Sequence, residues 1–191
     1  MRIYKAIPAV LLLTATVAFT QAPKGKDAPK VPTKAAPAAS KAAAKAPAVQ
    51  ANLGQLMKGI LYINANVIFA AQGNDPAKYP PAKDPSVSTD ALSSAYGKWE
   101  AVENSSLALI EGANLLTVAG RKCANGRAVP INNPDWPKFV QGLRDAGVVV
   151  YKAAQAKNQD KIIEAADVMT TACANCHDKY REKPNLADRC Q

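Results

Sequence analysis

The strongest constraint on the fold is a helical periodicity that recurs four times after residue 50. In each stretch, apolar side chains return at steps of three and four residues, which places them on one face of an α-helix. The period-two alternation of a strand runs through none of them. The residues of the four stripes are Leu53, Leu56, Met57, Ile60, Leu61, Val67, Ile68 and Ala71; Leu92, Tyr96, Trp99, Val102, Leu109, Ile110, Ala113 and Leu116; Trp136, Phe139, Val140, Leu143, Gly147, Val150, Tyr151 and Ala154; and Ile162, Ala166, Met169, Cys173, Cys176, His177 and Tyr180.

The segments between the stripes are loops. Residues 72–88 contain four prolines, and residues 121–137 form a second loop rich in Pro and Asn. Side chains able to cap a helix stand before the second and third helices: Ser88, Thr89 or Asp90, and Asn133 or Asp135. The predicted helices therefore cover residues 52–71, about 91–119, about 136–154 and about 161–183, and Pro184 ends the last of them.

Four antiparallel helices, each with one apolar stripe, predict an all-α protein with the architecture of an up-and-down four-helix bundle over residues 50–191. Such bundles build cofactor sites between facing helices. The aromatic side chains on the stripes are expected in the core: Tyr96, Trp99, Trp136, Phe139 and Tyr151.

The first 49 residues do not belong to this domain. Residues 1–21 combine basic residues at the start with an uncharged apolar run over residues 6–19, which is typical of a secretory signal peptide. The run is shorter than the roughly twenty residues of a bilayer span, although an uncleaved leader would still tether the protein. Residues 22–49 contain almost only Ala, Pro, Lys and small polar residues and are predicted to form a disordered tether.

The net charge of +9 lies mostly outside the predicted domain. Residues 1–49 hold eight Lys and Arg against one acid, whereas residues 50–191 hold sixteen against fourteen. A nearly neutral domain offers no electrostatic footprint for a phosphate backbone, so no nucleic-acid partner is expected. The Lys-rich tether is either a solvated spacer or a weak contact to a membrane surface.

The segment "TACANCHDKY" places two cysteines three residues apart with a histidine directly after the second. On a helix, Cys173, Cys176 and His177 share one face. Cys-x-x-Cys-His is the attachment motif of c-type haem, in which two thiols form thioethers and the imidazole binds the iron. The motif therefore predicts one covalently bound haem c, with Cys173 and Cys176 holding the macrocycle and His177 as metal ligand.

Two other uses of the motif stay open. A thioredoxin-like redox pair would need a strand before the motif, and the pattern contains none. A structural zinc site could combine Cys173, Cys176 and His177 with Cys123 or Cys190 as the fourth ligand. Zinc sites of this kind usually place their cysteine pair in a tight turn rather than within a helix.

The stretch "CANCHDKYREK" near the C-terminus, on the last of four helices, resembles the class II c-type cytochromes, the cytochrome c prime family. The resemblance covers residues 50–191 and is most specific at Cys173, Cys176, His177, Tyr180 and Arg181. It implies a four-helix bundle that binds haem on its fourth helix. It also implies that Arg181 lies on the proximal side of the haem, whereas the alternative is a solvated cation at a helix end.

The sixth iron ligand follows in part by elimination. His177 is the only histidine, so either a thioether or an open site remains. Met1 lies in the leader and Met169 shares a helix with His177, which leaves Met57 as a ligand or as a packing residue. The segment "LGQLMKGI" resembles the first helix of the low-spin branch of the family, which implies that Met57 is the axial ligand. Leu53 replaces an Arg that often meets a haem propionate there, so propionate partners stay unassigned.

Once haem has taken Cys173 and Cys176, two cysteines remain. In an exported protein this even count predicts a disulfide between Cys123 and Cys190, which joins the loop before the third helix to the C-terminal tail. Free thiols are the alternative.

Together these features predict an exported, periplasmic cytochrome that carries one electron between redox partner proteins through a His/Met haem. The alternative is a five-coordinate haem protein that binds nitric oxide or carbon monoxide. No catalytic constellation is recognisable, so an enzyme is not expected. The oligomeric state, including a homodimer, stays open, as do the electron donor and acceptor.

Overall fold

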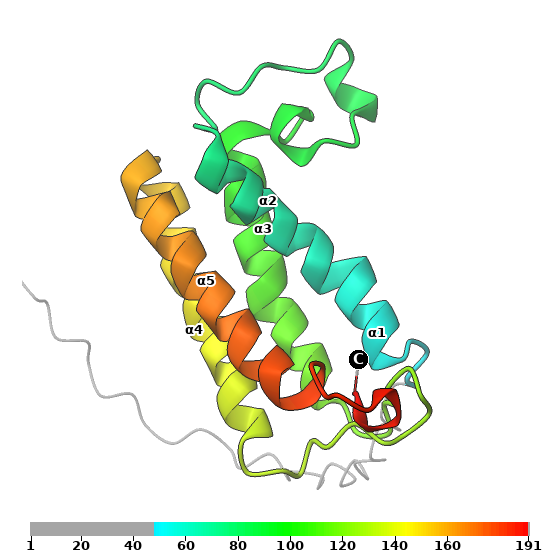
Figure 1. Ribbon diagram of the computed structural model, residues 1–191. Helices are drawn as coiled ribbons and strands as arrows, with labels where there is room; N and C mark the ends of the chain where they lie inside the picture. The colour runs from blue at the N-terminus through cyan, green and yellow to red at the C-terminus, as the bar shows by residue number, and fades with distance from the viewer. Residues whose placement is uncertain (1–47, 191) are drawn as a thin grey trace, which may run out of the picture. The chain divides into compact units, whose positions relative to one another are not determined.

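The computed structural model describes residues 48–190 (Figure 1), so the predicted signal peptide (residues 1–21) and nearly all of the predicted tether (residues 22–49) lie outside the described residues. Within residues 48–190 the regular structure is helical, as predicted, with four long helical segments and no strand. A single antiparallel bridge joins Lys122 and Ala128. None of the helices in this range is long and apolar enough to cross a bilayer.

The first helical segment is continuous but changes its winding. It consists of α1 (Leu53–Leu56), one π-helical turn η1 (Met57–Leu61) and α2 (Tyr62–Gly73). Asn52 and Gln55 form a capping box, in which each side chain accepts a hydrogen bond from the other residue's backbone N–H at 2.8 and 2.9 Å. The wider turn lets Leu56 and Leu61, five residues apart, both reach the core.

The second helix begins later than predicted. Residues 91–93 form a separate 3₁₀ turn, η3 (Ala91–Ser93), capped by Asp90, and α3 (Lys98–Gly112) follows, extended by η4 (Ala113–Thr117). The cause is a turn over residues 94–97, in which the N–H of Gly97 donates to the carbonyl of Ser94 at 3.0 Å and a Cβ atom at Gly97 would lie 2.4 Å from the carbonyl oxygen of Leu92. The bend turns Tyr96 outward, so the prediction that Tyr96 lies in the core is wrong: the side chain is 70% exposed.

The last two helices agree closely with the periodicity. They are α4 (Trp136–Gln155) and α5 (Gln159–Tyr180), separated by three residues. Asn158 caps α5 by accepting a hydrogen bond from the N–H of Lys161 at 2.9 Å. Asp135 stands at the N-cap of α4 but makes no cap hydrogen bond with its side chain.

The helices bury one continuous apolar core. α2 packs against α3 and α5, and α4 packs against the same two helices. Trp99 and Trp136 are buried as predicted, whereas Phe139 and Tyr151 are half-buried. α3 and α4 approach closely at Gly147, where an added Cβ would lie only 2.6 Å from Cγ1 of Ile110.

The start of the first helix, the loop between η4 and α4, and the C-terminal tail gather at one end of the helices, and the loop between α2 and α3 lies at the other (Figure 1). Buried Arg121 ties this end together by donating to the carbonyls of Leu115 and Ala51 at 3.1 and 2.6 Å. The N–H of Leu53 donates to the carbonyl of Lys122 at 2.8 Å.

Candidate cofactor site

A cavity of about 1080 Å³ opens between the first helical segment and α5, with walls from α3 and α4. Its volume is at the upper limit of the cavities that hold organic ligands and cofactors, roughly 300–1,000 Å³. Most of the side chains that line it are apolar, among them Leu61, Leu109, Trp136, Phe139, Val140 and Leu143.

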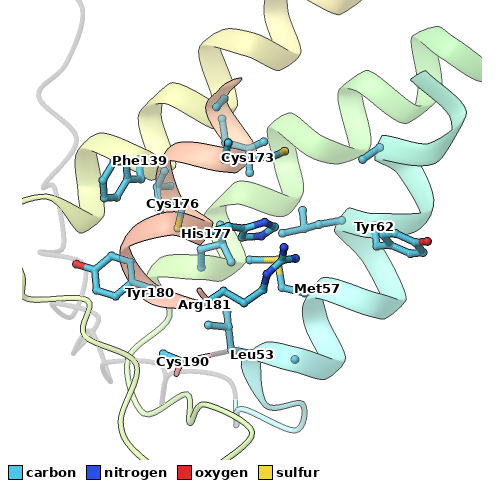
Figure 2. A pocket seen from close by; sticks show the side chains of 18 of the residues that line it. Leu53, Met57, Tyr62, Phe139, Cys173, Cys176, His177, Tyr180, Arg181 and Cys190 are labelled. Carbon is cyan, nitrogen blue, oxygen red and sulfur yellow. The ribbon is translucent and has the colours of Figure 1, made fainter. Parts of the chain in front are cut away.

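The residues of the cysteine and histidine motif all line this cavity. Cys173, Cys176 and His177 lie on the last two turns of α5, so the helical spacing brings them together as predicted. Met57 lines the same cavity from the π turn of the first helix. Figure 2 shows His177 and Met57 pointing into the cavity from their two helices.

The ionisation of these groups follows from their burial. Burial lowers the pKa of His177, and the neighbouring Arg181 guanidinium lowers it further, while Glu182 and Asp178 act in the opposite direction. The imidazole is therefore neutral near pH 7, which is the form that binds a metal.

The two thiols are shifted in the other direction. Burial raises the pKa of Cys176 to about 11, and repulsion from Asp135 and from the ionised form of Cys173 raises it as well. Burial also raises the pKa of Cys173, against the opposing effect of Arg181. Both groups are protonated at neutral pH, whereas a redox-active Cys-x-x-Cys pair relies on a thiolate.

Tyr180 forms an aromatic wall of the cavity with two residues of α4. Its ring lies edge-on to Trp136 and Phe139, at centroid distances of 4.9 and 6.2 Å. Its hydroxyl donates to Asp135 and accepts from Nδ2 of Asn133 at 3.3 Å. The sequence assigned Asp135 only as a cap, because a hydrogen bond across 45 residues leaves no local pattern.

Arg181 lines the cavity at the end of α5, one turn after His177. Its side chain is 45% exposed and forms an ion pair with Glu182 at 2.6 Å. The sequence offered two alternatives for Arg181, a position beside the haem or a solvated cation at a helix end. In the structure its side chain both borders the cavity and is partly solvated.

The C-terminal tail closes one side of the cavity. Cys190 lines it and is joined by a disulfide to Cys123, with Cα atoms 4.9 Å apart across 67 residues. The structure thus joins the two cysteines that the sequence predicted to form a disulfide. Asn125 reinforces the link by donating to the carbonyls of Ala187 and Arg189 at 3.0 and 2.7 Å.

The disulfide bears directly on the zinc alternative. Cys123 and Cys190 were the candidate fourth ligands, and both sulfur atoms are committed to each other. In the part of the chain that the structure describes, no group of three or more His, Cys, Asp or Glu side chains is arranged to hold a metal ion by itself.

Comparison of the chain with protein-family models, with curated proteins and with solved structures finds no match. The function is therefore inferred from the cavity and from the side chains that line it.

Proposed function

We propose that this protein is an exported c-type cytochrome that carries one electron between redox partner proteins. In this proposal residues 50–191 form an up-and-down four-helix bundle around one covalently attached haem c. One observation carries the proposal: both cysteines and the histidine of a Cys-x-x-Cys-His motif line one large apolar cavity, and a methionine from another helix lines it too.

The cavity suits haem in size and chemistry. A porphyrin is a broad apolar disc, and the cavity of about 1080 Å³ with its aliphatic and aromatic walls would exclude water from it. The protonated thiols of Cys173 and Cys176 would add to the two vinyl groups as thioethers, and neutral His177 would bind the iron. The haem supplies reversible one-electron chemistry, and the surrounding side chains set its reduction potential.

Met57 is the proposed second axial ligand. Thioether coordination opposite an imidazole raises the reduction potential of haem and favours electron transfer over ligand binding. The position of Met57 at a π turn supports the assignment, because single π turns within α-helices are frequent at functional sites.

The competing functions have less support. A redox-active cysteine pair conflicts with the raised thiol pKa values, and a zinc site of the kind considered above lacks its fourth thiolate. Peroxidase-like catalysis would need an acid-base group beside the iron, and the one histidine of the sequence is already assigned. Export and a periplasmic location belong to the same proposal, since haem attachment of this type accompanies the predicted leader.

The test is absorption spectroscopy of the full chain produced in a host with haem-attachment machinery. We expect a red protein whose haem survives denaturation, with sharp low-spin ferrous bands that carbon monoxide leaves unchanged. Met57→Ala should give high-spin spectra that shift on addition of carbon monoxide. Met169→Leu is the matched control, because it removes a fully buried thioether from α5 without touching the proposed ligand.

Each outcome decides a different part of the proposal. A colourless protein from a competent host would refute the cytochrome. High-spin, carbon monoxide-responsive spectra in the unaltered protein would refute Met57 ligation and favour the gas-binding alternative. Identical spectra for the unaltered protein and Met57→Ala would also remove the ligand assignment.

A further inference from the structure

Charge is unevenly distributed between the two ends of the helices. We define the pocket end as residues 48–58, 118–135 and 178–190, and the distal end as residues 72–103 and 152–167 (Figure 1). The pocket end carries eight Lys and Arg against four Asp and Glu, whereas the distal end carries six against eight. The domain is therefore electrically polar although its net charge is close to zero.

Ion pairing sharpens the contrast at the pocket end. Asp188 pairs with Arg127 at 3.3 Å and Asp135 with Lys179 at 3.6 Å, in addition to the pair between Glu182 and Arg181. Among the described residues, only Asp178 of the four acids there forms no ion pair. Four of the basic side chains at the surface of this end also form none within residues 48–190: Lys58, Lys122, Lys183 and Arg189.

A second, smaller cavity of about 230 Å³ lies within this basic surface. Lys179, Lys183 and Arg127 line it, together with the single acid Asp188. Its inner wall contains Tyr180 and Cys190, which also line the large cavity. An acidic side chain seated in the small cavity would therefore be separated from the proposed haem by this shared wall.

We propose that the pocket end, centred on the small cavity, is the docking surface for a redox partner protein with an acidic face. Opposite charge on two surfaces accelerates their encounter and orients them. The existence of the surface does not depend on haem, but the class of partner rests on the proposed electron-transfer function.

A protein partner fits this surface better than a lipid bilayer does. Peripheral membrane surfaces combine basic residues with several apolar side chains that enter the lipid. At the pocket end only one large apolar side chain of the described residues is exposed, Leu186. A hollow lined by basic side chains instead suits a single projecting carboxylate.

The experiment measures binding of a fluorescein-labelled oligoglutamate to the full exported chain by fluorescence anisotropy. Lys183→Glu is compared with Lys161→Glu, an exposed control of identical charge change at the distal end. At an ionic strength of about 0.1 M, where screening acts over about 10 Å, Lys183→Glu should weaken binding about threefold or more. Lys161→Glu should change it by less than about twofold. Residues 22–49 are the same in both variants, so their lysines do not contribute to the difference in binding between them.

Equal effects of the two substitutions would overturn the proposal, because binding would then follow net charge rather than a surface. A second arm uses vesicles of phosphatidylglycerol and phosphatidylcholine. Vesicle binding that depends on Lys183, without oligoglutamate binding, would assign the surface to a membrane and would also overturn it. Neither arm requires haem, so a colourless protein would refute the proposed function and leave this measurement intact.

Discussion

Removal of the Cys123–Cys190 disulfide should cost about 2–4 kcal/mol of unfolding free energy. The chain-entropy relation gives about 4 kcal/mol for a crosslink across 67 residues, because the open chain gains conformations that the crosslinked chain lacks. The closed loop contains α4 and α5 entire, so this freedom is restored to nearly half of the domain on unfolding.

The folded state should change little when the bond is cut. The tail is also held by backbone and side-chain hydrogen bonds: the N–H of Cys190 donates to the carbonyl of Tyr180 at 2.8 Å, and Arg127 donates to the carbonyl of Ala187 at 3.1 Å. The loss of stability therefore arises mainly in the unfolded ensemble. That origin also predicts a larger dependence of the free energy on urea concentration, since the freed chain exposes more surface.

Urea unfolding of the purified protein, followed by far-ultraviolet circular dichroism, tests this reasoning. Two samples lacking the crosslink are compared with the intact protein: the chemically reduced chain and the double variant Cys123→Ala with Cys190→Ala. Agreement between the two would exclude a packing effect at buried Cys123. A loss below about 1 kcal/mol in both would show that the crosslink does not restrict the unfolded chain as argued.

Two further predictions concern helix packing and the aromatic wall. Gly147→Ala should destabilise the domain by about 1–3 kcal/mol, because its Cβ would overlap Ile110, whereas Gly142→Ala, which meets nothing within 4 Å on the same helix, should stabilise it by up to about 1 kcal/mol. Equal urea midpoints for the two variants would contradict the close approach of α3 and α4. The hydroxyl of Tyr180 is the largest cause of the lowered pKa of Asp135, so Tyr180→Phe should raise that pKa, as a carboxyl NMR titration would report. A carboxyl whose pKa is lower in the folded than in the unfolded protein stabilises the fold above the unfolded pKa, and this stabilisation is lost as the pH falls through the folded pKa. Tyr180→Phe should therefore lose less stability on acidification than the unaltered protein. If the melting temperatures of the two proteins fall equally across that pH range, the reasoning is wrong.

The sequence predicted those parts of the fold that depend on local pattern. The apolar period located α4 and α5 to within three residues, and the spacing of Cys173, Cys176 and His177 implied one shared surface. A helical period reports which face is buried, and here each buried face meets the same core.

The predictions fail where a single contact overrides the apolar periodicity of the sequence. Tyr96 continues the apolar stripe of the second helix, but the chain turns over residues 94–97, and Gly97 permits this turn because the carbonyl oxygen of Leu92 lies where a Cβ atom would be. The bond between Tyr180 and Asp135 was likewise invisible, because it joins the end of α5 to the start of α4. Long-range contacts of this kind have no signature in neighbouring residues.

The π turn at Met57 was not predicted either, and it explains how one helix can serve two purposes. A residue inserted into an α-helix rotates everything beyond it by about 100°. With the wider turn, Leu53 and Leu56 are buried before it, while Ala65 and Ile68 face the core beyond it. Met57 begins that turn and lines the cavity while only partly buried. In a regular helix the same face would have to pack in the core and line the cavity. The local change in winding lets the first helix bury its apolar side chains in the core and still present the thioether of Met57 to the proposed haem.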